Sequence, residues 1–309
     1  MEGRLRLLAG PRRGRFPEST CPLVEYRGSR ILVDTGCLPG LGPMEVDAVV
    51  YTHHHPDHIR GSHLLAGAPV EYSPLGEAPY RSLRRLAWRF APQIWREWLS
   101  MALEAIGALR VPGDRYYEPG EDVCFRGLCL KTAPAPGHLA THTLVELPGG
   151  ILHLADIDLT GFGPWYGNPE SDPLAFLADI ELAATWGARA YTTSHRPGVL
   201  EAPEAQGLLA RYTRRLAEQL GAVLEAYRRS GPTAPGALVG RGIIYRRIPS
   251  DYPRIYEYFE YNMILKASNA LAGMGCLRRT PRGYEARGHC GAIEEIAVLA
   301  EAIGEGSLG

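Results

Sequence analysis

The chain has 309 residues, of which 45% are hydrophobic and 22% charged, a composition typical of a globular protein with a sizeable core. Its formal net charge of -1 argues against a global attraction to nucleic acid or to anionic membranes. No run approaches the roughly 20 apolar residues of a membrane-spanning helix, and the N-terminus lacks the apolar segment of a secretory signal, so we expect a cytoplasmic protein without a membrane span.

Residue usage gives two further expectations. The cysteines form no Cys-x-x-Cys pair, which predicts reduced, partly buried thiols and argues against a disulfide framework or a zinc ribbon. Arginine almost replaces lysine, and asparagine and glutamine are scarce, which fits a thermophile or a GC-rich genome. In a hyperthermophile, intracellular disulfides would be less improbable. The cysteines are Cys21, Cys37, Cys124, Cys129, Cys276 and Cys290.

The first predicted elements lead into a histidine cluster. Residues 23–34 contain two short apolar runs around a glycine, which predicts a β-hairpin. A further strand is predicted at residues 46–52, and the histidines follow it directly. The cluster therefore lies in a loop at the carboxyl end of a strand, where α/β folds usually place their chemistry.

Strands and helices alternate in the middle of the chain. A helix is predicted at residues 172–186, with Asp172 as its N-cap and Pro173 at the first helical position. Interleaved strands, hairpins and helices favour an α/β sandwich. Strand-like runs recur at residues 123–131, 143–147, 151–155 and 190–193.

Two segments are predicted as additions to that sandwich. Residues 80–110 contain two amphipathic helices with three tryptophans and a basic face, which form either a docked pair or a lid that gives the site an apolar wall. From about residue 205 the chain is mainly helical and ends in a basic hairpin with its turn at residues 281–283, which suggests a winged helix. We therefore expect a catalytic domain at 1–204 and a C-terminal region at 205–309.

The chemistry is carried by an HxHxDH pattern at residues 53–58. His53 and His55 alternate along the chain and can converge on one cation. Asp57 and His58 lie at the start of the next helix and can face a second cation. Neutral imidazole with carboxylate suits Zn²⁺, Fe²⁺ or Mn²⁺ and leaves coordination positions for water.

This pattern resembles the metallo-β-lactamase superfamily, and the other family motifs occur in the family order, each after a strand-like run. The resemblance covers roughly residues 21–198 and implies an αββα sandwich that holds two metal ions. Asp34 in ILVDTG matches the family aspartate that supports the ligands from behind. The implied ligands are His53, His55 and His138 for the first ion, Asp57, His58 and His195 for the second, and Asp156 as the bridge.

The bridging position departs from the family pattern. Ala155 precedes Asp156 where the family has glycine, and Asp158 is an alternative bridging carboxylate two residues further on. We prefer Asp156 because its distance from the preceding apolar run fits the motif. The remaining histidines are expected to be structural; they are His54, His63, His142, His153 and His289.

The resemblance implies a metal-dependent hydrolase. A hydroxide bridging the two ions, oriented by Asp57, would attack an ester, thioester or lactone carbonyl. Two divalent ions are expected as cofactors, with Zn²⁺ preferred and iron or manganese accepted by the same ligands. The oxygen-reducing flavo-diiron branch has a glutamate where His55 stands, so a redox function is disfavoured.

Two substrate classes remain open. An enzyme similar to hydroxyacylglutathione hydrolases and lactonases would hold a small-molecule acyl group. A phosphodiesterase or ribonuclease similar to the β-lactamase-like protein 2 group would hold phosphates with the arginines of the lid and the C-terminal region, although the near-neutral charge weakens this alternative. A regulatory metal-binding module is a third interpretation, and the lid could instead form the interface of a homodimer. The aromatic residues expected to line the substrate pocket are Trp165, Tyr166, Trp95 and Trp98.

Overall fold

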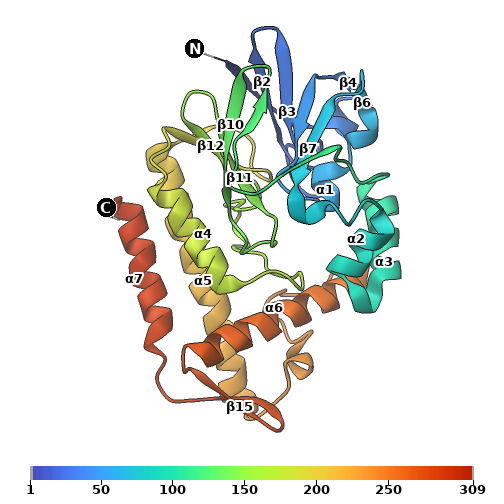
Figure 1. Ribbon diagram of the computed structural model, residues 1–309. Coiled ribbons are helices and arrows are strands. Elements are labelled where there is room, and N and C mark those ends of the chain that lie inside the picture. Colours follow the sequence, from blue (N-terminus) through green and yellow to red (C-terminus); the bar gives the residue numbers. More distant parts are fainter. Residues whose placement is uncertain (1–2, 308–309) are drawn as a thin grey trace.

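Two six-stranded sheets form the centre of the computed structural model, which describes residues 3–307 (Figure 1). The strands of the first sheet are β1 (Arg4–Leu8), β2 (Cys21–Tyr26), β3 (Ser29–Val33), β5 (Ala48–Val50), β7 (Val70–Pro74) and β8 (Arg115–Tyr117), in this spatial order. The second sheet contains, also in spatial order, β14 (Leu200–Glu201), β13 (Ala190–Thr192), β12 (Ile151–His153), β11 (Thr143–Leu147), β10 (Leu128–Pro134) and β9 (Val123–Phe125).

The sheets pack face to face through an apolar core. Val24 and Ile31 from the first sheet and Val145 and Ile151 from the second belong to one buried cluster. The outer face of the second sheet is covered by α4 (Pro173–Thr185) and by the first half of α5 (Ala202–Ser230). The outer face of the first sheet packs against the helices of residues 83–106. These layers confirm the expected αββα sandwich.

Most predicted elements are present, with one informative difference. The run at residues 123–131 forms two antiparallel strands, β9 and β10, rather than one strand. Arg126 and Gly127 both have positive φ angles, of 44° and 84°, so the chain reverses there in a tight hairpin. The predicted helix at 172–186 is α4, and the Asp172 carboxylate accepts hydrogen bonds from the backbone N–H groups of Leu174 and Ala175.

The insertion at residues 80–110 forms a compact helical segment, here called the lid. It contains α2 (Leu83–Phe90), α3 (Trp95–Ser100) and a π-helical turn at Met101–Ile106. Leu86, Phe90 and Trp98 are buried against the first sheet. The segment is docked on the body and also reaches the site described below.

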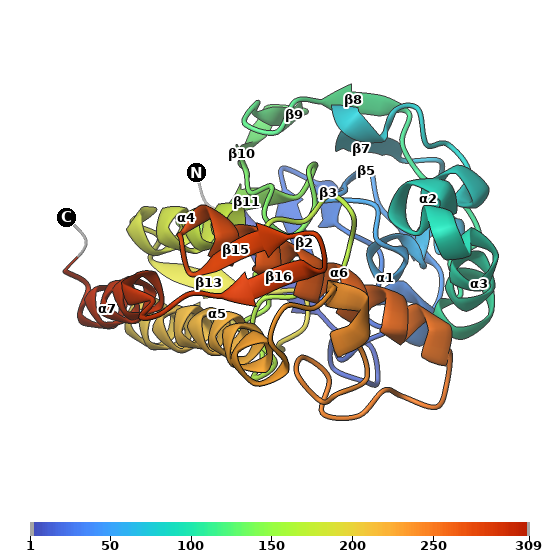
Figure 2. The same cartoon turned by 90° about the horizontal axis from the view of Figure 1, so that it is seen from below.

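The C-terminal region is helical, as expected, with a hairpin near its end. After α5 it contains α6 (Pro253–Gly273), the hairpin strands β15 (Leu277–Thr280) and β16 (Gly283–Ala286), and α7 (Gly291–Glu305). Figure 2, seen from below, shows the hairpin beside α5 and α6, with α7 lying alongside α5. The helix α6 is continuous because no glycine or proline interrupts residues 254–272.

The cysteines are paired, so the expectation of reduced thiols is wrong. The strands bring together partners that no short sequence motif reveals; the β9–β10 register, for example, places Cys129 opposite Cys124. No cysteine within residues 3–307 is free. The disulfides are Cys21–Cys37, Cys124–Cys129 and Cys276–Cys290.

A helix that crosses a bilayer must be both long and apolar. Among residues 3–307, no helix combines the two properties to the extent required.

Candidate metal centre

The predicted ligands converge at one edge of the sandwich because each follows a strand. His53 and His55 come after β5, and the short helix α1 (Pro56–Ile59) carries Asp57 and His58. The second sheet contributes from the loops after three of its strands. These loops hold His138 after β10, Asp156 after β12 and His195 after β13.

A first group of donors contains three histidines and one carboxylate. The ligand atoms of His53, His55, His138 and Asp156 lie within 4.8 Å of one another, and all four residues are buried. His55 Nδ1 lies 3.0 Å from His53 Nε2 and 2.9 Å from His138 Nε2. Imidazole nitrogens and a carboxylate oxygen at such spacing suit a divalent cation.

A second group lies beside the first and shares its carboxylate. It contains Asp57, His58 and His195, whose ligand atoms also lie within 4.8 Å of one another. Asp156 Oδ2 faces the first group, 3.2 Å from His138 Nε2. Its Oδ1 faces the second, 2.9 Å from His58 Nε2 and 3.4 Å from His195 Nε2. The two oxygens of Asp156 thus point into different groups.

Two buried atoms test whether these residues fit a cation. His58 Nε2 and Asp156 Oδ1 lie 2.9 Å apart, and among the residues described neither atom makes a hydrogen bond of regular geometry. Buried polar atoms are nearly always satisfied, so such a pair in one cluster needs an explanation. A divalent cation next to both atoms would supply it. The donor groups therefore fit the metal that the resemblance implies.

Asp34 supports this arrangement from behind. Its Oδ2 lies 2.8 Å from His58 Nδ1 and accepts a hydrogen bond of 2.8 Å from the Thr52 hydroxyl. Its Oδ1 accepts from the Thr52 backbone N–H at 2.9 Å. A partner on Nδ1 fixes the ring so that Nε2 faces the second group.

Backbone carbonyl groups orient two further imidazoles. His138 Nδ1 donates to the carbonyl oxygen of Trp165 at 3.1 Å. His195 Nδ1 lies 2.9 Å from the Gly14 carbonyl oxygen and 3.1 Å from that of Glu18. In both residues Nε2 therefore keeps its lone pair for a cation.

The turn before Asp156 explains why the family has glycine there. Ala155 has a φ of 46°, in the left-handed region that favours glycine. The Asp156 backbone N–H donates to His142 Nε2 at 3.0 Å, which gives His142 the structural role expected of it. Asp158 accepts hydrogen bonds from the N–H and hydroxyl of Thr160 and belongs to neither donor group.

Burial and charge set the protonation of the ligands in opposite directions. Burial holds the pKa of His53 and His55 well below the ordinary value, which keeps these imidazoles neutral. Burial also lowers the pKa of His58, but the carboxylates of Asp156 and Asp34 outweigh it and raise the pKa well above the ordinary value. A proton on His58 and a cation would compete for the same negative charge, so metal binding is expected to release protons.

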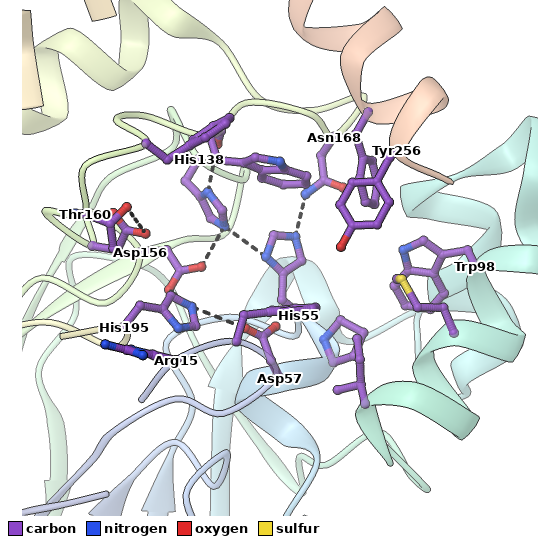
Figure 3. A pocket seen from close by; sticks show the side chains of 18 of the residues that line it. Arg15, His55, Asp57, Trp98, His138, Asp156, Thr160, Asn168, His195 and Tyr256 are labelled. Atoms are coloured by element: carbon purple, nitrogen blue, oxygen red, sulfur yellow. Dashed lines mark hydrogen bonds and ion pairs between the residues drawn. The ribbon is translucent and has the colours of Figure 1, made fainter. Parts of the chain in front are cut away.

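A cavity of about 410 Å³ opens beside the donor groups (Figure 3). His55, Asp57, His138, Asp156 and His195 line its floor. Most of the remaining wall is aromatic or aliphatic and comes from three distant parts of the chain. These are the lid (Trp98, Met101, Ile106), the loop after Asp156 (Phe162, Trp165) and the C-terminal region (Tyr245, Tyr256, Phe259).

Two residues expected in the substrate pocket lie elsewhere. Tyr166 is fully buried in the core formed by α5 and α6, because it points away from its neighbour Trp165, which reaches the cavity. Trp95 stacks on Trp88 of α2, with ring centroids 5.3 Å apart, and does not line the cavity. Trp98 and Trp165 line the cavity.

Several residues of the site were not predicted from the sequence. Asn168 contacts His55 Nε2, the ring nitrogen that faces away from the first group. Arg15 and Phe16 reach the cavity from the loop between β1 and β2. For these residues the sequence carries no recognisable signal. The C-terminal wall of the cavity does have a sequence signal, because aromatic residues are frequent between residues 245 and 261.

The comparisons with known proteins agree with this site. The family model of the Metallo-beta-lactamase superfamily matches residues 15–187, more than half of the chain. The chain belongs to this superfamily, and its donor groups make it a metallo-hydrolase of that class. No match is found among curated proteins.

Solved structures share the fold over nearly the whole chain. A metallo-beta-lactamase family protein from Thermus thermophilus is 21% identical, with a TM-score of 0.64 over 93% of this chain and 99% of that one. A beta-lactamase domain protein from Burkholderia ambifaria is 19% identical, with a TM-score of 0.60 over 93% of this chain and 91% of that one. Both alignments extend beyond the family match, so these proteins share the C-terminal region in fold.

Proposed function

We propose that the chain binds two divalent metal ions, preferably Zn²⁺ with iron or manganese as alternatives, and hydrolyses an ester, thioester or lactone. The observation that carries this proposal is the position of Asp156, whose two oxygens face two separate donor groups on the floor of an apolar cavity. In this proposal His53, His55, His138 and Asp156 hold one ion. Asp57, His58, His195 and Asp156 hold the other.

In this proposal different side chains of the site perform different parts of the reaction. Ions held there would supply Lewis acidity, which lowers the pKa of water and polarises a carbonyl oxygen. Asp57, on the cavity floor, would accept a hydrogen bond from the attacking water and orient it. The aromatic walls would bind the acyl group and keep bulk water away from the reacting atoms.

The apolar lining favours an acyl substrate over a phosphodiester. Trp98, Trp165 and Phe259 supply area for an apolar group, and Tyr245 is already engaged because its hydroxyl accepts from Trp165 Nε1 at 2.9 Å. A phosphodiester or RNA would instead need several cations along its path. Arg15 is the single arginine or lysine on the described cavity wall, so the phosphodiesterase remains the second candidate.

A side-by-side assay tests the proposal. Metal-stripped protein is loaded with zinc, iron or manganese and given an acyl thioester, an acyl lactone and bis-p-nitrophenyl phosphate. We expect turnover of a carbonyl substrate only, and on the order of a 100-fold loss in Asp57→Ala, which also excludes contaminating enzymes. His63→Ala is the matched control, since this histidine is exposed and outside both donor groups. Turnover of the phosphodiester alone would overturn the acyl assignment.

The cellular location of the protein, its source organism and its oligomeric state are proposals as well. We propose a cytoplasmic protein of a thermophile, and the three disulfides fit this source because intracellular disulfides are frequent in organisms of the highest growth temperatures. A homodimer through the lid is supported by the exposed side chains of Trp88, Leu103 and Leu109. Sedimentation of the wild-type protein beside Trp88→Glu tests the dimer, which this substitution should weaken.

A further inference from the structure

The loop between β1 and β2, residues 9–20, is built into the metal centre. The carbonyl groups of Gly14 and Glu18 face His195 Nδ1, and the Ser19 hydroxyl donates to the Asp57 carbonyl oxygen at 3.2 Å. Gly14 has a φ of 82°, and a side chain there would meet the Ser194 carbonyl oxygen at 2.9 Å. The loop is therefore fixed between two ligands of the second donor group.

Arg15 lies within this fixed loop and lines the cavity. It is exposed, and within residues 3–307 its guanidinium makes no ion pair or hydrogen bond. Two neighbouring arginines instead donate hydrogen bonds to the backbone of the loop. Arg12 donates to the Phe16 carbonyl oxygen, and Arg60 donates to that of Pro17 at 2.9 Å. They hold the loop, whereas Arg15 presents an unpaired positive charge to the cavity.

The two ends of the cavity differ in charge and polarity. Figure 3 shows Arg15 and Thr160 at the end where His195 and Asp156 lie, and Trp98 and Tyr256 at the opposite end. A substrate that spans the floor would place unlike groups at its two ends. The end next to the second donor group would lie beside Arg15.

The same end of the cavity also contains the carboxylate of Asp158. Asp158 lines the cavity, and a free carboxylate there would repel an anion. Its oxygens already accept from the Thr160 N–H at 2.9 Å and from the Thr160 hydroxyl at 3.2 Å, and it contacts Tyr212. These donors disperse its charge, whereas the charge of Arg15 has no counterpart.

We propose that the substrate is an acyl ester or thioester whose leaving group carries an acidic function, which pairs with Arg15 while the acyl group occupies the aromatic side. This inference rests on the proposed acyl hydrolase activity. Guanidinium pairs with carboxylates through two parallel hydrogen bonds, and such charge-assisted bonds are stronger than neutral ones. Partial enclosure by the cavity strengthens the pair relative to one in open water.

Two esters that differ only in this charge test the inference. They are 4-nitrophenyl butyrate and 3-carboxy-4-nitrophenyl butyrate, assayed with the metal-loaded full chain. In Arg15→Gln, kcat/KM for the carboxylated ester should fall on the order of tenfold, mainly through KM, while the neutral ester changes less than about twofold. Arg15→Lys should retain part of the preference. Arg13→Gln removes an equal charge from an exposed position of the same loop and should change neither ester.

The outcomes separate the two proposals. If the wild-type protein hydrolyses neither ester nor any other carbonyl substrate, the proposed function fails. If it hydrolyses both esters and Arg15→Gln leaves their ratio unchanged, only the inference fails. An equal loss for Arg13→Gln and Arg15→Gln would also overturn it, because the effect would then come from the general charge of the loop.

Discussion

Asp179 shows how a single buried carboxylate positions a ligand loop. Its Oδ2 accepts a 2.6 Å hydrogen bond from the Gly137 backbone N–H, directly before His138. Burial raises the pKa of Asp179 to about 7, although the Gly137 hydrogen bond opposes the shift. The unfolded chain would bind the proton less tightly than the folded chain, so this residue's contribution to stability decreases as the pH rises.

Asp179→Asn tests this coupling between charge and stability. The wild-type protein loses stability at this residue from about pH 4 to about pH 7, because the folded form must ionise a buried acid. The variant has no charge to ionise. Its free energy of unfolding relative to wild type should therefore rise by about 2–4 kcal/mol between pH 4 and pH 8. Urea unfolding at both pH values measures this, and a difference independent of pH would contradict it.

The ligands are the part of the site that the sequence predicts best. Each lies within a few residues of a strand end, so the local pattern and the strand together determine its place. Ala155, at a φ of 46°, shows that a motif position can differ in residue and keep its conformation. The prediction for Tyr166 was wrong because neighbours in an irregular loop can point in opposite directions, which no local pattern reveals.

At the scale of elements, Arg89 connects the lid to the body. This side chain of α2 donates to Glu77 at 2.6 Å and to Glu170 at 2.6 and 2.7 Å, and Glu77 is buried. Burial raises the pKa of Glu77 to about 7, while Arg89 acts in the opposite direction. The ion pair thus fixes α2 beside the loop that carries Asn168.

Arg89→Met should destabilise the protein because it removes the guanidinium that pairs with the buried Glu77 carboxylate and leaves only the Thr141 hydroxyl as a donor to it. We expect a loss of about 3–5 kcal/mol in the free energy of unfolding at pH 8. At pH 6 the loss should be smaller, since Glu77 can then take up a proton. Arg85→Met, at an exposed position of the same helix, is the control and should change stability by less than about 0.5 kcal/mol. Equal losses in the two variants would contradict the account.

The walls of the cavity could not be predicted from sequence in the same way. They come from the N-terminal loop, the lid, the loop after Asp156 and the C-terminal region, which are distant in the chain and meet only in the folded protein. Trp98 and Trp165 were found because they are conspicuous residue types near the core motifs. Arg15 and Asn168 lie in loops whose local composition indicates nothing about their partners.

At the scale of the whole molecule, the disulfides connect parts that local pattern cannot pair. Cys276–Cys290 joins the start of β15 to the N-cap of α7 across 14 residues, whereas Cys124–Cys129 spans 5 residues within one hairpin. A longer closed loop restricts the unfolded chain more strongly. The Cys276–Cys290 disulfide should therefore stabilise the folded protein more than the Cys124–Cys129 disulfide does.

Paired substitutions test this difference. Cys276→Ala with Cys290→Ala should lower the free energy of unfolding by about 3 kcal/mol, and Cys124→Ala with Cys129→Ala by about 2 kcal/mol. Denaturant unfolding without reductant measures both. If neither pair of substitutions changes stability, the thiols are reduced in the folded protein, as the sequence first suggested.

The metal content of the purified protein tests the central claim most directly. After metal stripping, loading with zinc and dialysis, elemental analysis should find two ions per wild-type chain. His195→Ala should retain about one, because this substitution removes a ligand of the second group only. The same variant should lose activity on carbonyl substrates. A wild-type chain that retains no ion, or a His195→Ala variant that retains both with full activity, would contradict the assignment of the donor groups.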